Sequence, residues 1–289
     1  MLKLIAIDLD GTLLSEGEHI SEENIKAIKR AEQEDIQVVI ATGRSYLDAH
    51  LICERVGLTN DIISCNGASI HSRDGQQLSA LKMEKQDVEQ ILRWLADQNF
   101  YYEVTTNKAI YAPCLGRKIL ELELKDLTGK ISEENMVVSQ KLIELTHGQF
   151  GMVFVNGYQE FIGQDSAFYK ILVCSFDKEK RKKGIEQFRG MKQLTMVSSF
   201  ESNFELVNQK ASKGNALSML AAQLKIPFDQ VMAIGDSPND ISMLEKVKYS
   251  VAMGNAKEEI KKICNFVTYT NRKNGVAHAI YQALDAKKN

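Results

Sequence analysis

Continuous apolar runs of strand length alternate with helical patterns in the first part of the chain. The runs cover residues 3–7, 36–41 and 61–65, and the spacing of apolar residues predicts helices between them, over residues 21–31 and 45–56. Short continuous apolar runs are typical of buried parallel strands. A repeated strand–helix order therefore predicts a doubly wound parallel sheet of the α/β class.

The same alternation returns near residue 210, after a long interval with a different pattern. Strands are predicted at 230–234 and 249–252, with helices near 212–224, 238–244, 257–263 and 276–284. The interval, residues 83–208, mixes helical and strand patterns without that repeat. We therefore predict that residues 1–82 and 209–289 form one domain, into which residues 83–208 are inserted as a separate α+β domain.

Two carboxylates follow the first predicted strand at once, in the segment Asp8-Leu9-Asp10-Gly11-Thr12. Ligands of open α/β sheets bind beyond the carboxyl ends of the strands, and alternate residues of an extended segment point the same way. Asp8 and Asp10 can therefore approach one pocket, where their mutual repulsion would be relieved by a divalent cation such as Mg²⁺. An ordinary solvated Asp-Gly turn explains this segment, taken alone, equally well.

Three further polar segments stand at a strand end or a helix start: Thr42-Gly43-Arg44, Lys213, and Gly235-Asp236 with Asn239-Asp240. Each has an ordinary structural explanation, because Thr42 could cap a helix and the aspartates could be surface charges. Arg44 could be structural or could contact a substrate. Lys213 could be a solvated lysine, but a cation at a helix N-terminus opposes the macrodipole, and the placement is easier to understand if Lys213 faces an anion.

The composition is typical of a soluble globular protein, with 44% hydrophobic and 26% charged residues and a formal net charge of −2 over 289 residues. This charge balance gives no support for binding to nucleic acid or to an anionic membrane. Five scattered cysteines without a CxxC pair argue against a disulfide framework or a zinc site. Because neither a signal-peptide pattern nor a membrane-spanning apolar run occurs, we expect a cytoplasmic protein. The sequence leaves the oligomeric state open, as a monomer or a homodimer.

Taken in order, the motifs resemble those of the haloacid dehalogenase-like (HAD) superfamily: DxDGT at 8–12, a strand-end Thr42, SKG at 212–214 and GDSPND at 235–240. The position of the insert, together with TGR at 42–44, SKGNAL at 212–217 and MGNA at 253–256, resembles the Cof-like members, which carry a type IIB cap. The middle of the chain matches in position and length only. The resemblance implies a catalytic core with a cap formed by residues 83–208.

The resemblance also implies a role for each matching residue. Asp8 would be the nucleophile that forms an aspartyl-phosphate, and Asp10 the general acid and then base. Asp8, the backbone carbonyl of Asp10 and Asp236 would hold Mg²⁺. The residues expected to hold the phosphate are Thr42, Gly43, Lys213 and Asn239, with Asp240, Arg44 and Asn66 in support. Asn66-Gly67 could also be only a turn, and Asn255 and Asn271 could order loops near the site.

The function expected from this resemblance is Mg²⁺-dependent hydrolysis of small phosphorylated metabolites, such as sugar phosphates. A phosphomutase that isomerises a sugar phosphate through phospho-Asp8 is the alternative on the same scaffold. A receiver-type signalling module also combines aspartates, a threonine and a lysine, but such modules are about one small domain long and lack an inserted cap. Dinucleotide binding is disfavoured, because no GxGxxG follows the first strand.

Overall fold

The computed structural model describes residues 2–15, 19–198 and 201–286, and the chain divides into two compact units. The first unit runs to Ala80 and resumes at Ala211, and the second is Leu81–Lys210. Residues 1, 16–18, 199–200 and 287–289 of the predicted domains lie outside the described residues. Among the residues described, no helix combines the length and the hydrophobicity of a transmembrane span.

The first unit contains a sheet with the strand order β14-β13-β12-β1-β2-β3-β4-β5. Pairing is parallel from β14 to β3 and antiparallel between β3, β4 and β5. The strands are β1 (Leu4–Asp8), β2 (Gln37–Ala41), β3 (Asp61–Ser64), β4 (Ser69–His71), β5 (Gln77–Ala80), β12 (Val231–Gly235), β13 (Tyr249–Ala252) and β14 (Phe266–Val267). The predicted doubly wound α/β core is confirmed, and β1 lies at its centre between β2 and β12.

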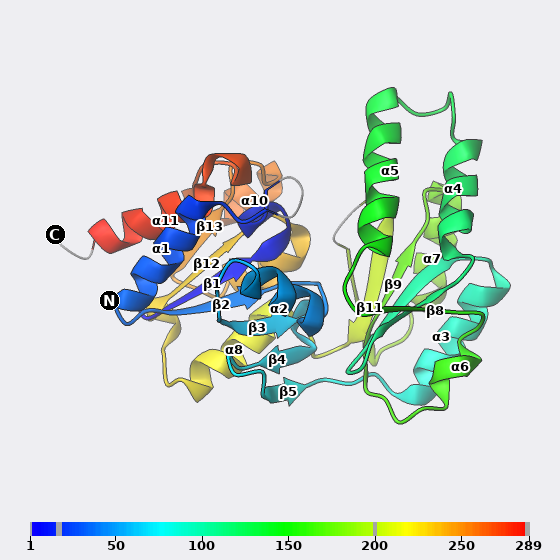
Figure 1. The fold of residues 1–289 in the computed structure, drawn as a ribbon, viewed down its shortest axis with the longest axis horizontal. Coiled ribbons are helices and arrows are strands. Elements are labelled where there is room, and N and C mark those ends of the chain that lie inside the picture. Colours follow the sequence, from blue (N-terminus) through cyan, green and yellow to red (C-terminus); the bar gives the residue numbers. More distant parts are fainter. Residues whose placement is uncertain (1, 16–18, 199–200, 287–289) are drawn as a thin grey trace. The chain divides into compact units, whose positions relative to one another are not determined.

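Helices cover both faces of this sheet, since one apolar core lies on each side. On one face α1 and α11 lie side by side (Figure 1), and α2 packs with them. Helices α8, α9 and α10 pack on the other face. Ala27, Ile28 and Ala31 of α1 are buried, as the predicted helical spacing requires. The helices are α1 (Glu22–Gln33), α2 (Tyr46–Glu54), α8 (Lys213–Gln223), α9 (Ile241–Leu244), α10 (Glu258–Ile263) and α11 (Gly275–Asp285).

The second unit is built on a separate sheet with the order β10-β11-β9-β6-β7-β8, antiparallel except for the β7–β8 pair. Apolar residues of α3, α6 and α7 pack on one face of this sheet, and residues of α4 and α5 pack on the other. Its elements are α3 (Lys85–Asp97), β6 (Tyr101–Thr106), β7 (Ile110–Pro113), α4 (Gly116–Asp126), α5 (Glu133–His147), β8 (Met152–Val155), α6 (Gln159–Ile162), β9 (Phe168–Cys174), α7 (Lys178–Phe188), β10 (Leu194–Val197) and β11 (Asn203–Asn208).

Strands β4, β5, β8 and β14, of two to four residues each, were not predicted from the sequence. Length alone does not explain this, because β3 and β13 also have only four residues and were predicted. The helical pattern over residues 138–146 predicts a helix there, and helix α5 begins earlier, at Glu133. Its first turn is polar and exposed, and Ser132 Oγ accepts a hydrogen bond from the Asn135 backbone N–H at 3.2 Å. Polar helix starts of this kind carry no apolar signal.

Candidate active site

The turn after β1 brings Asp8 and Asp10 to the carboxyl edge of the first sheet. Asp8 is the last residue of β1 and is buried, whereas Asp10 is partly exposed. Gly11 has a φ of 79°, a conformation that residues with a side chain rarely adopt. A Cβ at Gly11 would also lie only 2.5 Å from Oδ2 of Asp236. Glycine at this position therefore lets the β1 turn lie against the turn that follows the neighbouring strand β12.

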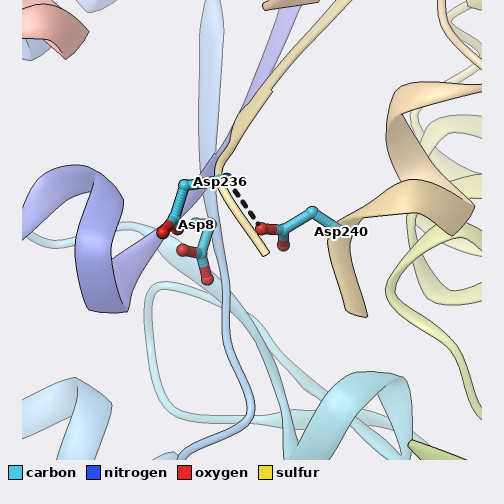
Figure 2. Close-up of side chains that lie close together, drawn as sticks. All are labelled: Asp8, Asp236 and Asp240. Atoms are coloured by element: carbon cyan, nitrogen blue, oxygen red, sulfur yellow. Dashed lines mark hydrogen bonds between the residues drawn. The ribbon is translucent and has the colours of Figure 1, made fainter. Parts of the chain in front are cut away.

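Three aspartates from two neighbouring strands gather at this edge. One carboxylate oxygen from each of Asp8, Asp236 and Asp240 lies within 4.8 Å of the others (Figure 2). Asp236 follows β12, and Asp240 ends the short helical turn Pro238–Asp240. Oδ2 of Asp240 accepts hydrogen bonds from the backbone N–H groups of Asp236 and Ser237, both at 3.0 Å. The Asp240 carboxylate thus fixes the loop that carries Asp236.

Lys213 supplies the positive charge of this cluster. Its Nζ donates to Oδ1 of Asp8 at 2.6 Å and to Oδ1 of Asp240 at 2.7 Å, and the side chain is fully buried. The N-terminus of α8 is held close by the turn after β3, because a Cβ on Gly67 would lie 2.2 Å from the carbonyl oxygen of Ser212. The alternative of a solvated lysine at the helix start is therefore wrong.

Burial and mutual repulsion shift the proton affinities of these groups. The pKa of Asp8 is raised well above its usual range, first by burial and then by the charge of Asp240, although Lys213 opposes the rise. Burial, with repulsion from Asp240, raises the pKa of Asp236 to about 6. The pKa of Lys213 is also raised, since the carboxylates of Asp240 and Asp8 outweigh the effect of burial. The cluster therefore has more negative charge than one lysine balances.

The oxygens of the cluster fit a hard divalent cation. Oδ2 of Asp8 is buried and has no hydrogen-bond partner among the described residues. Oδ1 of Asp236 accepts from the Thr12 hydroxyl at 3.0 Å, which leaves this carboxylate lone pairs to offer. Both oxygens of Asp240 are engaged by Lys213 and backbone N–H groups, so Asp240 is better suited to support than to ligation. The side chain of Asp10 binds Arg44, and the contribution of its backbone carbonyl stays a prediction.

The turns after β2 and β3 are tied together beside the cluster. Thr42 is fully buried, and its Oγ1 accepts from the Arg44 backbone N–H at 3.1 Å. The Asn66 backbone N–H donates to the Thr42 carbonyl at 3.0 Å. Thr42 does not cap α2, because Ser45 is the N-cap and its hydroxyl accepts from Asp48 N–H. The capping alternative for Thr42 is therefore wrong, and Gly43 lies in the middle of this fixed loop.

Asn239 links the turn after β12 to the turn after β3. Its Nδ2 donates to Oδ1 of Asn66 at 3.0 Å, while its own Oδ1 is buried without a hydrogen-bond partner in the described part of the chain. Asn66 lies in the turn after β3 with a φ of 55°, and it is buried. The structure thus brings every predicted site residue to one edge of the first sheet, and their catalytic roles stay predictions.

Sequence reasoning gave no role to Thr12 or Asp48, and it treated Asn255 only as a residue that could order a loop. Nδ2 of Asn255 donates to the Gly11 carbonyl at 2.9 Å and so holds the turn after β1. Thr12 contacts Asp236, as described above. Asp48 receives a hydrogen bond from Nη1 of Arg44 at 2.8 Å. The i,i+4 spacing of Arg44 and Asp48 was the available signal for this last contact.

Comparison with known proteins identifies the family. A model of the haloacid dehalogenase-like hydrolases matches residues 5–280. The chain belongs to this family. A phosphatase of Bacillus subtilis (strain 168), YwpJ, is 44% identical over 98% of this chain and 100% of its own length. A second protein of that strain, named 5-amino-6-(5-phospho-D-ribitylamino)uracil phosphatase YwtE, is 35% identical over 99% of both chains.

A solved structure agrees with this family membership. The structure of a haloacid dehalogenase-like hydrolase from B. subtilis has a TM-score of 0.86 and 44% identity, and the match covers 97% of this chain and 99% of that one. The family resemblance inferred from the motifs, and the expectation of a hydrolase related to phosphatases, are therefore confirmed.

Proposed function

We propose that this protein is a Mg²⁺-dependent phosphatase that hydrolyses small phosphorylated metabolites through an aspartyl-phosphate on Asp8. The observation that carries the proposal is the buried contact of Lys213 with Asp8 and Asp240, beside Asp236. A carboxylate can attack phosphorus when it is ionised and positioned. Lys213 favours the ionised form of Asp8, which burial alone would disfavour.

Asp8 and Asp236 are the side chains proposed to hold Mg²⁺, with the backbone carbonyl of Asp10. Oδ2 of Asp8 supports this assignment, because it is buried without a hydrogen-bond partner among the residues that the structure describes, and a buried carboxylate oxygen normally has one. When bound, the ion offsets negative charge on the transferring phosphoryl group.

Asp8, Asp10 and Lys213 are proposed to have separate roles in the reaction. An oxygen of Asp8 attacks the phosphorus while the bond to the leaving alcohol breaks, and Asp10 gives a proton to the leaving oxygen. Asp10 then takes a proton from a water molecule, which attacks the phosphorus and releases phosphate from Asp8. Lys213 keeps its charge throughout. Such a transfer depends mainly on position and electrostatics.

Oxygens of the phosphate are proposed to be held by groups that surround this edge of the sheet. These groups are the Thr42 hydroxyl, the Gly43 backbone N–H, Lys213 and the Asn239 amide. Asn66 supports Asn239 through the 3.0 Å hydrogen bond described above. Asp240 supports Lys213 in the same way, because it shares the ammonium group with Asp8.

The substrate class is proposed from the chemistry of the relatives. The name of the 35% identical B. subtilis protein describes a phosphate ester on a ribityl chain, which is a phosphorylated polyol. We extend this class, phosphorylated sugars, polyols and related metabolites, to the present protein. The second unit, Leu81–Lys210, is proposed as the cap that selects among them.

A panel of phosphorylated metabolites tests this function. We expect inorganic phosphate to be released from one or more sugar or polyol phosphates in the presence of Mg²⁺, and the panel should include 5-amino-6-(5-phospho-D-ribitylamino)uracil. Phosphate is measured colorimetrically, and the remaining esters by chromatography. Interconversion of sugar phosphate isomers without phosphate release would contradict hydrolysis and indicate a phosphomutase.

Removal of metal should abolish turnover and lower stability. We expect activity to fall at least about 100-fold in EDTA and to return with excess Mg²⁺, since the ion offsets charge in the transition state. Mg²⁺ that binds only the folded protein should add about 2.7 kcal/mol to the free energy of unfolding at 100 times its dissociation constant, seen as a higher melting temperature.

Because the pKa of Asp236 is raised to about 6, its ionisation in EDTA costs stability as the pH rises from about 4 to 6. The gain in melting temperature from Mg²⁺ should therefore be larger at pH 7.5 than at pH 5, where protons compete for the ligands. Asp236→Asn should remove most of this gain. Asp229→Asn is the matched control, because Asp229 is an exposed aspartate just before the same strand β12. Equal gains in wild type and Asp236→Asn would show that the ion binds elsewhere.

A further inference from the structure

We propose that Arg44, anchored by Asp48, is a positioning residue that fixes the carboxylate of Asp10 for proton transfer. This inference rests on the function proposed above, in which Asp10 is the acid and base. Nε of Arg44 lies 3.1 and 2.9 Å from the two oxygens of Asp10, and Nη2 donates to Oδ1 at 2.7 Å. The planar guanidinium thus holds both oxygens of one carboxylate.

Asp48 holds the other end of the guanidinium. Nη1 of Arg44 donates to Oδ2 of Asp48 at 2.8 Å, and the Asp48 side chain is only 2% exposed. Asp48 lies in the first turn of α2, where a carboxylate is favoured by the helix dipole, and its backbone N–H is capped by Ser45. A carboxylate so deeply buried cannot turn toward water, so it fixes where Arg44 points.

The backbone of Arg44 is fixed as well. Its N–H donates to Thr42 Oγ1 at 3.1 Å, and its carbonyl accepts from the Cys65 N–H at 2.8 Å. With only 8% of Arg44 exposed, its side chain is a rigid part of the loop proposed to hold the phosphate. Arg44 therefore links Asp10, through its side chain, to Thr42, through its backbone N–H.

Asp10 is the residue that needs such support. Its side chain is 37% exposed, unlike that of Asp8 at 5%, and an exposed aspartate on a turn can occupy several rotamers. Hydrogen bonds from two N–H groups of the rigid guanidinium, Nε and Nη2, select a single arrangement of the Asp10 carboxylate. Preorganised acid groups contribute through their position, so a small displacement of Asp10 should slow the step in which it acts.

The proposed step is the first half of the reaction. The bond from phosphorus to the alcohol oxygen breaks, a bond from phosphorus to an oxygen of Asp8 forms, and the proton of Asp10 moves to the alcohol oxygen. The alkoxide of benzyl alcohol is strongly basic and needs this proton to leave. The 4-nitrophenolate ion is weakly basic and leaves without it. Loss of positioning should therefore affect a benzyl ester more than a 4-nitrophenyl ester.

The test compares kcat/KM for benzyl phosphate and 4-nitrophenyl phosphate, since kcat/KM reports steps up to formation of the phosphoenzyme. Asp10→Asn should lower the benzyl value about 10²–10⁴-fold, and the 4-nitrophenyl value much less. Arg44→Lys keeps the charge but loses the fork, and should lower the benzyl value by about tenfold or more, again with a smaller effect on the nitrophenyl ester. Arg30→Lys is the matched control, because Arg30 also pairs with an acid four residues later but lies half-exposed on α1.

Asp48 provides a second test that leaves Arg44 in place. Asp48→Ala should show the same preference for the nitrophenyl ester, because the guanidinium loses its anchor. Asp48→Asn should restore most of the benzyl activity, since its amide oxygen can still accept from Nη1. If both Asp48 variants treat the two esters as wild type does, the anchoring role is overturned.

Other outcomes separate the positioning role from the proposed function. If Arg44→Lys lowers kcat/KM equally for both esters, Arg44 acts in phosphate binding or in folding. A gain in kcat/KM would show that the ion pair with Arg44 keeps Asp10 from transferring its proton. Either result overturns the positioning role, provided that Asp10→Asn still lowers kcat/KM more for the benzyl ester than for the nitrophenyl ester. If Asp10→Asn itself shows no such dependence, the proposed function of Asp10 fails instead.

Discussion

Asp8→Asn should abolish phosphate release, with kcat reduced by at least about 10⁴-fold on any substrate that the wild type hydrolyses. An amide does not attack phosphorus, so the covalent intermediate cannot form. The side chains have the same shape, and the amide oxygen can still accept from Lys213. The variant should therefore remain folded.

The stability of the variant makes the result decisive. The pKa of Asp8 is raised in the folded protein, so its ionisation costs stability as the pH rises above the ordinary aspartate range. Asparagine carries no charge and avoids this cost. We expect a melting temperature at pH 7.5 close to or above that of wild type, measured in EDTA, together with the loss of turnover.

Trapping of the intermediate provides an independent measurement. Acid quenching and mass spectrometry should find a phosphorylated aspartate at position 8 in the wild type and none in Asp8→Asn. Asp229→Asn, on the exposed turn before β12, should behave as wild type in both assays. Phosphate release by purified Asp8→Asn at the wild-type rate would sink the assignment of Asp8 as the nucleophile.

Lys213→Met should lower both stability and activity. Methionine keeps most of the apolar stem but leaves Asp8 and Asp240 buried without their cation. Breaking a buried ion pair from one side typically costs about 3–5 kcal/mol, and we expect a loss of that order in the free energy of unfolding at pH 7.5. Activity should fall with it, because the phosphate loses a fixed positive charge.

The loss of stability in Lys213→Met should depend on pH. Lys213 opposes the rise in the pKa of Asp8, so its removal raises that pKa further. A group with a folded pKa above its unfolded value contributes most stability at low pH and loses it as the pH rises. Denaturant titrations in EDTA should therefore show a smaller defect at pH 5 than at pH 7.5.

Two comparisons control for this prediction. Lys225→Met changes an exposed lysine just after α8 and should be nearly neutral. The double variant Lys213→Met with Asp240→Asn should recover part of the lost stability, because it removes one of the two uncompensated charges. A Lys213→Met protein as stable as wild type at pH 7.5 would show that the buried cluster does not depend on this lysine.

The fold of the first unit, and the sheet edge that carries the site, could be predicted from the sequence because the carboxyl ends of parallel strands lie at the same edge of a sheet. Asp8 and Asp236 are far apart along the chain, yet each ends an apolar run, and β1 and β12 turn out to be neighbours. The topology of the fold thus brings the two turns together. The burial of Lys213 could not be predicted locally, since it depends on the long-range contact of Gly67 with Ser212.

The sequence did not predict which way the side chains of the site point. Arg44 was expected either to be structural or to contact a substrate, and nothing local showed that it would turn to Asp10. Its 2.7 Å contact with Asp10 joins residues in different turns, and the partly exposed Asp10 side chain could have pointed elsewhere. Such choices depend on packing around both residues and become visible only in three dimensions.

The insertion of Leu81–Lys210 between the two halves of the first unit has a consequence for synthesis on the ribosome. The central strand β1 can pair early with β2, but its other partner, β12, begins at Val231. About 150 residues are added after Ala80 before that strand exists, which takes roughly 8–30 s at 5–20 residues per second. During that time β1, every residue of which is buried in the folded protein, has one open edge. Open strand edges are sites where chains associate wrongly and chaperones bind.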